Sequence, residues 1–298
     1  MSAMKAFALS ITLALAGLSA ACAHAQPPKP LLWKVSDADN HVYLLGSFHA
    51  LKPDDYPLAP SVDAALADAE KYVFELSPAE LRSPDLGPKM AKAALIGNGQ
   101  TLRQSLPPSL MAELQKYFDS NGIPTERMIV FRPWFVSLVV SVTEMQRIGY
   151  DPKFGLDQQL IDRIAASGKP AIGLETGDEQ IAALASMTAS EQQLALREAL
   201  DEAAHFRTEM DALHSEWRAG DADALFARMG TDLKQHYPAL YQRIDVDRNQ
   251  AWLPKIRAML DGEKHDDSLI VVGSLHLLGP DGLVAQLKAL GYRVERVE

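Results

Sequence analysis

Two nine-residue segments near opposite ends of the chain repeat the same pattern around a histidine. The first, GSFHALKPD, occupies residues 46–54, and the second, GSLHLLGPD, occupies residues 273–281. Each follows a short apolar run, and a glycine at that point is typical of a chain that turns sharply at a sheet edge. Ligands bind at the carboxyl ends of strands in open α/β sheets. We therefore expect His49 and His276 at such an edge, converging on one point if a pseudo-twofold axis relates the segments.

Two acids end apolar runs in a similar way. Glu75 falls in KYVFEL and Glu175 closes PAIGLE, where a carboxylate needs a partner or water. Two histidines with one or two glutamates form a ligand set suited to a divalent transition metal such as manganese, cobalt or zinc. Such an ion would acidify a bound water and polarise a carbonyl, leaving one glutamate as general base. Taken singly, Glu75 also suits a solvent-facing strand end, and Glu175 suits a helix start capped by Thr176.

A further polar pair precedes an apolar helical face in DVDRNQAWLPKI, residues 245–256. Arg248 and Asn249 can point from a helix start into a site, where the arginine would clamp an anion or stabilise an oxyanion. The alternative is a solvated helix start. Asp157, in GLDQQL, is by position an acid in the first turn of a helix. Five more histidines have no constellation in the sequence and are expected as surface or core residues: His41, His205, His214, His236 and His265.

The elements that position these residues alternate between short apolar runs and long helical stretches. Residues 31–35 and 41–47 flank an Asp- and Asn-rich turn and predict a β-hairpin. Further strands are predicted at 71–76, 170–175, 268–274 and 292–298. Helices are expected in between, including a buried core helix within 131–150. Strands at both chain ends predict an α/β fold, with a central mixed β-sheet formed by both ends and extensive helical insertions covering it.

Composition excludes some classes of function. The chain has 298 residues, 47% of them hydrophobic, and a formal net charge of −10. This length is enough for one large domain with a sizeable core. No Lys/Arg cluster stands out, so nucleic acid is not expected as a partner. The sequence contains no GxSxG nucleophile elbow, no P-loop, no HExxH and no GxGxxG motif.

The first 25 residues are interpreted separately from the globule. A lysine, an apolar stretch over 6–21 and the triplet Ala-His-Ala predict a signal peptide that is cleaved after Ala25. The only cysteine, Cys22, allows a lipoprotein interpretation, but LSAAC matches a lipobox only loosely. Residues 26–298 are then expected to form one exported domain, periplasmic or secreted, without a transmembrane helix.

These motifs, in this order, resemble the TraB/GumN family, which is grouped with the Tiki proteases and the PrgY pheromone-shutdown proteins. The resemblance rests on GSFH, FEL, GLDQQL, GLETGDEQ, RN-x-x-W and GSLH, and it covers the chain from Leu31 to Val297. It implies a metal-dependent, peptidase-like site. The metal ligands that the family leads us to expect fall on His49, His276 and Glu75. The other polar positions of the family site fall on Arg248, Asn249, Glu175 and Asp157.

Three functions are open on the sequence. The first is a metallopeptidase acting on peptides, in which Glu175 or Asp157 activates water and the two histidine side chains lie within about 5 Å of each other. The second is a protein that sequesters a peptide or small molecule without turnover, which is favoured if Glu75 points away from the histidines. The third is a metal-free, esterase-type hydrolase, in which His49 or His276 is the base and a second acid orients it.

Overall fold

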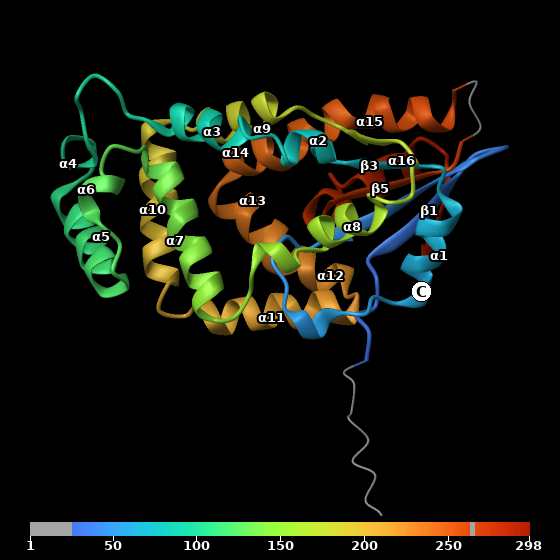
Figure 1. The fold of residues 1–298 in the computed structure, drawn as a ribbon, viewed down its shortest axis with the longest axis horizontal. Coiled ribbons are helices and arrows are strands. Elements are labelled where there is room, and N and C mark those ends of the chain that lie inside the picture. Colours follow the sequence, from blue (N-terminus) through green and yellow to red (C-terminus); the bar gives the residue numbers. More distant parts are fainter. Residues whose placement is uncertain (1–25, 263–265) are drawn as a thin grey trace, which may run out of the picture.

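The computed structural model of the chain describes residues 26–262 and 266–298 (Figure 1). The expected signal peptide, with Cys22 and the cleavage point after Ala25, lies outside the described residues, as does His265. Within the described part of the chain, no helix has the length and apolar character needed to cross a membrane.

Within the described residues, six strands form one sheet, and both the amino-terminal and carboxy-terminal segments contribute to it, as predicted. The strands are β1 (Leu32–Ser36), β2 (His41–Ser47), β3 (Lys71–Phe74), β4 (Ala171–Gly173), β5 (Ser268–Gly273) and β6 (Arg293–Val297). Their order across the sheet is β4-β3-β5-β2-β1-β6. Strands β4, β3, β5 and β2 run parallel, whereas β1 pairs antiparallel with both β2 and β6. The mixed sheet and the hairpin of β1 and β2 are both confirmed.

The two repeated segments leave the sheet from adjacent strands. β2 and β5 are parallel neighbours, with Ser47 opposite Gly273. Convergence of the two histidines therefore needs no pseudo-twofold axis, because neighbouring parallel strands end at the same edge of the sheet. His49 and His276 still follow strand ends at the same edge of the sheet, as expected. The repeat thus reflects two adjacent strands with similar endings.

Helices fill the long segments between the strands. Those before β4 are α1 (Pro60–Asp68), α2 (Pro78–Leu81), α3 (Leu86–Ala94), α4 (Leu102–Ser105), α5 (Pro108–Asn121), α6 (Thr125–Met128), α7 (Pro133–Arg147) and α8 (Leu156–Ile164). Those after β4 are α9 (Gly177–Ala185), α10 (Ala189–Glu202), α11 (Phe206–Ala219), α12 (Ala222–Leu225), α13 (Asp232–His236), α14 (Pro238–Tyr241), α15 (Asp247–Leu260) and α16 (Leu283–Ala289). Three short 3-10 turns are η1 (Pro53–Asp55), η2 (Pro152–Phe154) and η5 (Ser274–Leu277), and two π-helical segments are η3 (Phe226–Thr231) and η4 (Gln242–Val246).

The main apolar core lies on the sheet. Every residue of β5 is buried, as expected for a parallel strand that is covered on both faces. A second apolar cluster, which includes Leu110, Leu114 and Phe118, holds together α4, α5, α6, α7 and α10. Figure 1 shows α4, α5 and α6 at the opposite end of the molecule from β1. The inserted helices therefore have packing of their own in addition to their contacts with the sheet.

A buried core helix is predicted within 131–150. The helix is present as α7, but it is only partly buried. Trp134 and Val140 on α7 are fully buried, whereas Leu138 and Val142 are 40% and 39% exposed. One side of α7 packs against α10 and α11. The sequence did not reveal that the other side of α7 is partly exposed to solvent. In a helix with apolar residues on all sides, hydrophobic periodicity does not indicate which side is buried.

Candidate functional site

Four side chains with catalytic or metal-binding chemistry lie at the carboxyl edge of the parallel strands. His49 follows β2, Glu75 follows β3, Glu175 follows β4, and His276 lies in η5 directly after β5. Because β4, β3, β5 and β2 are consecutive in the sheet, their carboxyl ends form one continuous edge. These four residues are far apart in the sequence, and the parallel strands bring them close together at one edge of the sheet.

The glycines of the two motifs allow neighbouring side chains to approach the backbone closely, and they are not needed for a sharp turn of the chain. Neither Gly46 nor Gly273 has a positive φ, so the sharp turn expected from the sequence is not what requires them. A Cβ on Gly273 would lie 3.0 Å from His49 Nε2, 3.3 Å from Glu75 Oε1 and 3.7 Å from His276 Cδ2. Gly273 therefore leaves free the space on which these three side chains converge.

Glu75 points towards both histidines. Its Oε1 lies 3.9 Å from His49 Nε2 and 4.0 Å from His276 Nε2. The same oxygen accepts a hydrogen bond of 2.7 Å from the backbone N–H of Gly273. Burial raises the pKa of Glu75, but His276, His49 and Arg248 together with that N–H outweigh burial and hold the pKa at about 2. Glu75 is therefore a fixed carboxylate between two imidazoles.

His49 is oriented by Asp157, which lies in the first turn of α8. Its Nδ1 is 3.0 Å from Asp157 Oδ1, and the Ser47 hydroxyl donates to the same oxygen at 2.6 Å. This leaves Nε2 of His49 directed to the Glu75 side. Burial lowers the pKa of His49, but the carboxylates of Asp157 and Glu75 raise it to about 9. The His49 side chain is 61% exposed, so solvent screens these interactions in part.

Arg248, in the first turn of α15, joins the two strand-end acids. Its Nε and Nη2 donate to the two oxygens of Glu175 at 3.0 and 2.6 Å, and Nη2 also donates to Glu75 Oε2 at 2.5 Å. A two-oxygen pairing of this kind fixes the guanidinium plane. The remaining Nη1 donates to Nε2 of His276 at 2.9 Å. Arg248 thus lies within the group of residues predicted as metal ligands, in direct contact with two of them.

The tautomer of His276 follows from its neighbours. An arginine N–H can only donate, so Nε2 of His276 accepts and its Nδ1 carries the proton. Nδ1 donates to Asn249 Oδ1 at 2.8 Å and lies 3.1 Å from Asp245 Oδ1. The Trp252 ring packs on the imidazole with a centroid distance of 4.5 Å. His276 is therefore buried and held from three sides.

Two residues that the sequence analysis did not single out contribute to this group. Asp245 is 1% exposed and lies behind His276. Gln180 on α9 donates to Glu175 Oε1 at 3.0 Å and to Glu75 Oε2 at 3.4 Å. Asp245 precedes Arg248 by three residues, so helical spacing places both on one face and could have indicated it. No local pattern in the sequence points to Gln180.

The donor atoms of His49, Glu75 and His276 are of the types that bind a divalent transition-metal ion. The distances between them match those expected for ligands of one ion only in part. Imidazole nitrogen and carboxylate oxygen are the usual ligands of such ions, and Gly273 leaves the space between His49, Glu75 and His276 free. Two ligands of one ion lie at most about 4.2 Å apart, twice a bond of roughly 2.1 Å, which the distances from Glu75 to each histidine meet. Arg248, however, donates to Nε2 of His276. The three donor atoms are also not all within 4.8 Å of one another. Ion binding by all three residues therefore requires the two histidines to move closer together and that hydrogen bond to open.

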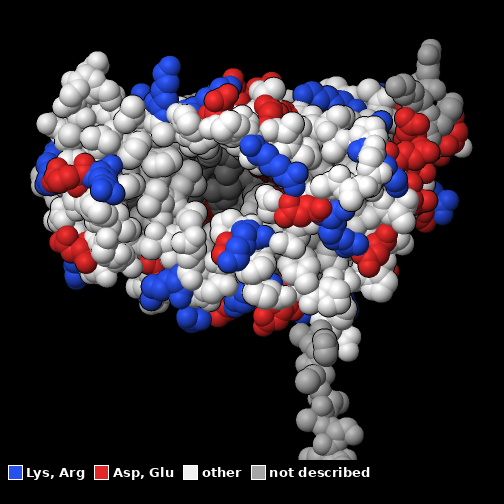
Figure 2. Space-filling model, viewed as in Figure 1, with Lys and Arg blue, Asp and Glu red and all other residues white. Residues whose placement is uncertain are grey.

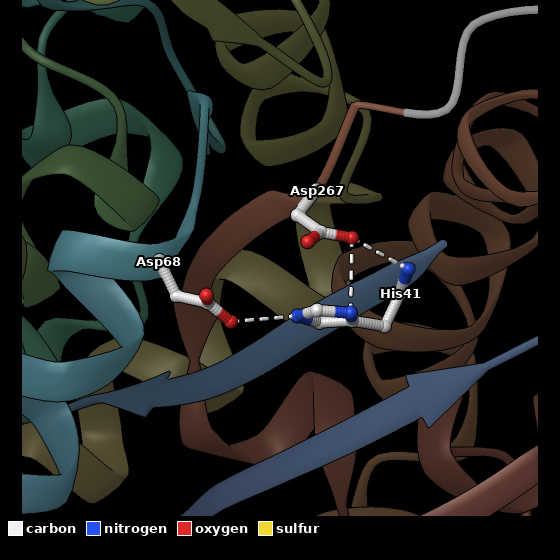
Figure 3. Close-up of side chains that lie close together, drawn as sticks. All are labelled: His41, Asp68 and Asp267. Carbon is white, nitrogen blue, oxygen red and sulfur yellow. Dashed lines mark hydrogen bonds and ion pairs between the residues drawn. The ribbon is translucent and has the colours of Figure 1, made fainter. Parts of the chain in front are cut away.

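Among the described residues, one group of three histidine or carboxylate side chains brings its donor atoms within 4.8 Å of one another, and it lies elsewhere. His41 lies between Asp68 and Asp267 at the amino ends of β2 and β5 (Figure 3). Its Nε2 is 2.9 Å from Asp68, and its Nδ1 is 2.9 Å from Asp267. The expectation that His41 has no constellation is wrong. Because the two carboxylates contact different ring nitrogens, their contacts tie α1 and the start of β5 to β2.

A cavity of about 760 Å³ opens over the carboxyl edge of the sheet. His49, Glu75, Asp157, Arg248 and His276 all line it. Figure 2 shows the surface hollowed between the sheet region and the helical end of the molecule. The catalytic candidates are therefore accessible to a ligand from solvent. A smaller cavity of about 350 Å³ adjoins the Glu175 and Arg248 pair.

The fold and this edge site define an α/β protein with paired Gly-x-x-His motifs. The profile of the TraB/PrgY/gumN family matches residues 31–296, and the chain belongs to that family. It is similar to the uncharacterized protein YbaP of Escherichia coli (strain K12) and of Shigella flexneri. Each is 25% identical over 253 residues, which cover 84% of this chain and 89% of the relative. No solved structure matches the chain significantly.

Proposed function

We propose that this protein is a metal-dependent hydrolase that cleaves an amide or ester bond of a peptide or other small molecule. The observation that supports the proposal is the convergence of His49, Glu75 and His276 on the space that Gly273 leaves free. Glu75 points towards both histidines, which counts against sequestration by a site lacking its acid. The cavity gives a substrate access to all three side chains.

The residues that would hold the ion are His49 and His276 through Nε2 and Glu75 through Oε1. A manganese, cobalt or zinc ion would supply an acidified water and a polarised carbonyl. Carboxylates surround the site: Glu75 and Glu175 pair with the guanidinium of Arg248, and Asp157 holds His49. Like charges held close together are relieved by a bound cation.

The remaining side chains position the reacting groups. Asp157 holds Nδ1 of His49, and Asn249 holds Nδ1 of His276, so that each Nε2 faces the site. Partners of this kind orient ligating histidines and raise their basicity. Arg248 would stabilise negative charge that develops on a substrate carbonyl oxygen. Its two hydrogen bonds to Glu175 keep it in place when its contact with His276 opens.

A metal-free hydrolase is a second candidate, favoured by the contact between His49 and Asp157. A histidine whose Nδ1 is held by a carboxylate at 3.0 Å has the arrangement of an oriented general base. The raised pKa of His49 opposes both candidates, since a protonated imidazole neither accepts a proton nor binds an ion. We rank this candidate second because Glu75 also faces both histidines, which a metal-free base does not require.

Binding of manganese, cobalt and zinc to the purified protein tests the proposal, measured by calorimetry and by elemental mass spectrometry. We expect about one equivalent per chain, lost in Glu75→Gln and His49→Ala. His41→Ala is the matched control, because His41 belongs to the other His/Asp group. Loss of binding in His41→Ala with retention in Glu75→Gln would place the ion elsewhere and contradict the proposal. Incubation of the loaded protein with a peptide mixture, followed by mass spectrometry, then tests turnover.

The proposal includes export, with removal of a signal peptide after Ala25 and a periplasmic or extracellular location. The support is the leader-like sequence of residues 1–25. Amino-terminal sequencing of the protein recovered from a periplasmic fraction tests it. A chain beginning at Gln26 is the expected result, and a lipid-modified Cys22 would favour the lipoprotein alternative.

A further inference from the structure

The cavity above the site has a polar end and an apolar end. The charged and histidine side chains belong to the sheet edge, to η4 and to the starts of α8 and α15. The strand ends also contribute apolar residues such as Phe48 and Phe74, and the inserted helices add Val142 and Met145 on α7, Leu184 on α9, and Met210 and Leu213 on α11. None of the five side chains from the helices can hydrogen-bond strongly to a ligand. A ligand that reaches from the sheet edge to these helices therefore meets charged groups at the sheet edge and apolar side chains on α7 and α11.

The apolar wall is partly open, although such surface is normally buried. Val142 is 39% exposed and Leu81 is 36% exposed, and both line the cavity. Apolar surface that is left accessible inside a concave site is typical of a place where a ligand covers it. Three methionines, Met145, Met210 and Met229, contribute to the wall, and methionine adapts its shape to different apolar partners.

We infer that the substrate carries a bulky apolar group next to the bond that is cleaved, and that this group occupies the helical end of the cavity. The inference rests on the proposed function and names its substrate class. The polar end would receive the amide or ester carbonyl, beside His49, Glu75 and Arg248. The volume of about 760 Å³ is within the range of sites that enclose a whole small ligand. The apolar group is either the acyl chain of an ester or amide, or the large side chains of a peptide.

Two matched substrate series distinguish these sources. One series consists of p-nitrophenyl esters from acetate to decanoate, and the other of short peptide p-nitroanilides that carry either alanine or leucine. We expect kcat/KM to rise roughly fourfold for each buried methylene until the cavity is filled. The series that shows the rise identifies whether an acyl chain or a peptide side chain is the group recognised.

Substitutions on one helix provide the matched pair of variants. Val142→Glu places a charge in the apolar wall, whereas Leu138→Glu places it one turn earlier on α7 at a position of equal exposure that does not line the cavity. Val142→Glu should lower kcat/KM for the longest apolar substrate by about tenfold or more, since a buried charge rejects an apolar group. Leu138→Glu should leave it within about twofold, as for most surface substitutions. Circular dichroism of both variants is the control for folding.

Binding without turnover separates this inference from the proposed function. The probe is 11-(dansylamino)undecanoic acid, whose fluorescence is followed in the Glu75→Gln variant. Probe binding that Val142→Glu weakens and Leu138→Glu does not supports the apolar occupant even if no substrate is cleaved, in which case only the hydrolase proposal falls. Turnover that is independent of chain length and unaffected by Val142→Glu would overturn the inference and leave the hydrolase proposal standing. Absence of both binding and turnover would overturn both.

Discussion

Ser47 of the first Gly-x-x-His motif lies opposite Gly273, the first residue of the second motif, in the parallel pair of β2 and β5. The two motifs are therefore offset by one residue along the sheet. This offset places Gly273 between the side chains that follow the two strands, where its missing Cβ leaves room for His49, Glu75 and His276. The glycine of the second motif thus has a role in the site that the glycine of the first motif does not share.

Gly273→Ala should impair the site more than the fold. The added Cβ would lie 3.0 Å from His49 Nε2 and 3.3 Å from Glu75 Oε1, so the side chains must move apart. We expect ion affinity to fall at least about tenfold, the usual scale for disturbed ligand positioning. Calorimetric titration with manganese, cobalt and zinc measures it.

Gly87→Ala on α3 is the control for this change, because a Cβ there meets nothing within 4 Å. It should leave ion binding unchanged and raise stability by roughly 0.5–1 kcal/mol, the cost of glycine in a helix. Unaltered ion affinity in Gly273→Ala would contradict the convergence of three ligands on this point.

Arg248 and Glu175 should be energetically coupled. Their side chains are 15% and 7% exposed and share two hydrogen bonds. Arg248→Met leaves Glu175 and Glu75 without their common cation and should destabilise the protein by roughly 3–5 kcal/mol. The double variant Arg248→Met/Glu175→Gln should be more stable than the sum of the single effects predicts, by about 0.5–3 kcal/mol. Urea denaturation of all four proteins gives the coupling energy, and simple additivity would show that the pair is not a unit.

Asn249 should affect ion binding without contacting the ion. It is fully buried and accepts the Nδ1 proton of His276 at 2.8 Å. Asn249→Ala removes that acceptor and should weaken ion affinity about 10- to 100-fold. Asn249→Asp retains an acceptor oxygen and should recover part of the loss. If alanine and aspartate weaken binding equally, Asn249 contributes through packing alone.

Asp55 should control stability in acid. It is 1% exposed, accepts from the Lys52 backbone N–H at 2.9 Å, contacts His214 Nε2 at 2.8 Å and pairs with Arg218. Burial raises the pKa of Asp55, but His214 and the other partners outweigh it and lower the pKa. The folded state therefore releases this proton more readily than the unfolded state. The stability that Asp55 contributes is present above the ordinary Asp pKa of about 3.9 and is lost as pH falls through the lower, folded value.

Asp55→Asn removes this pH dependence. At neutral pH the variant should be less stable by roughly 3–5 kcal/mol, since buried charges lose their partner. Its stability should then change less than that of wild type between neutral pH and acid. Thermal unfolding across that range measures both effects, and the exposed neighbour Asp54 supplies the control, Asp54→Asn. If the stability of Asp55→Asn falls with decreasing pH as steeply as that of wild type, other carboxylates cause the loss of stability in acid.

Much of the fold could be predicted because the strands carry strong local signals. The segments 41–47 and 268–274 contain the apolar runs VYLL and LIVV and end in recognisable motifs. β2 and β5 occupy these segments almost residue for residue. A helix is expected between the strands predicted at 268–274 and 292–298, and α16 begins there only at Leu283. Gly279 adopts a positive φ, and the chain forms a turn there before the helix starts. The local sequence therefore predicted that a helix forms here, but the backbone turn at Gly279 determined the residue at which it begins.

The sequence by itself determined which residues stand at the strand ends: His49, Glu75, Glu175 and His276 follow apolar runs whose pattern is local. Only the tertiary structure decided that Asp157 orients His49, that Arg248 contacts His276, and that α7 presents Val142 to a cavity. Asp157 and His49 are 108 residues apart in sequence. Hydrophobic periodicity specifies which face of a helix is buried but not which partner it meets. That choice depends on how the inserted helices pack over the sheet, where contacts between distant segments compete for the same space.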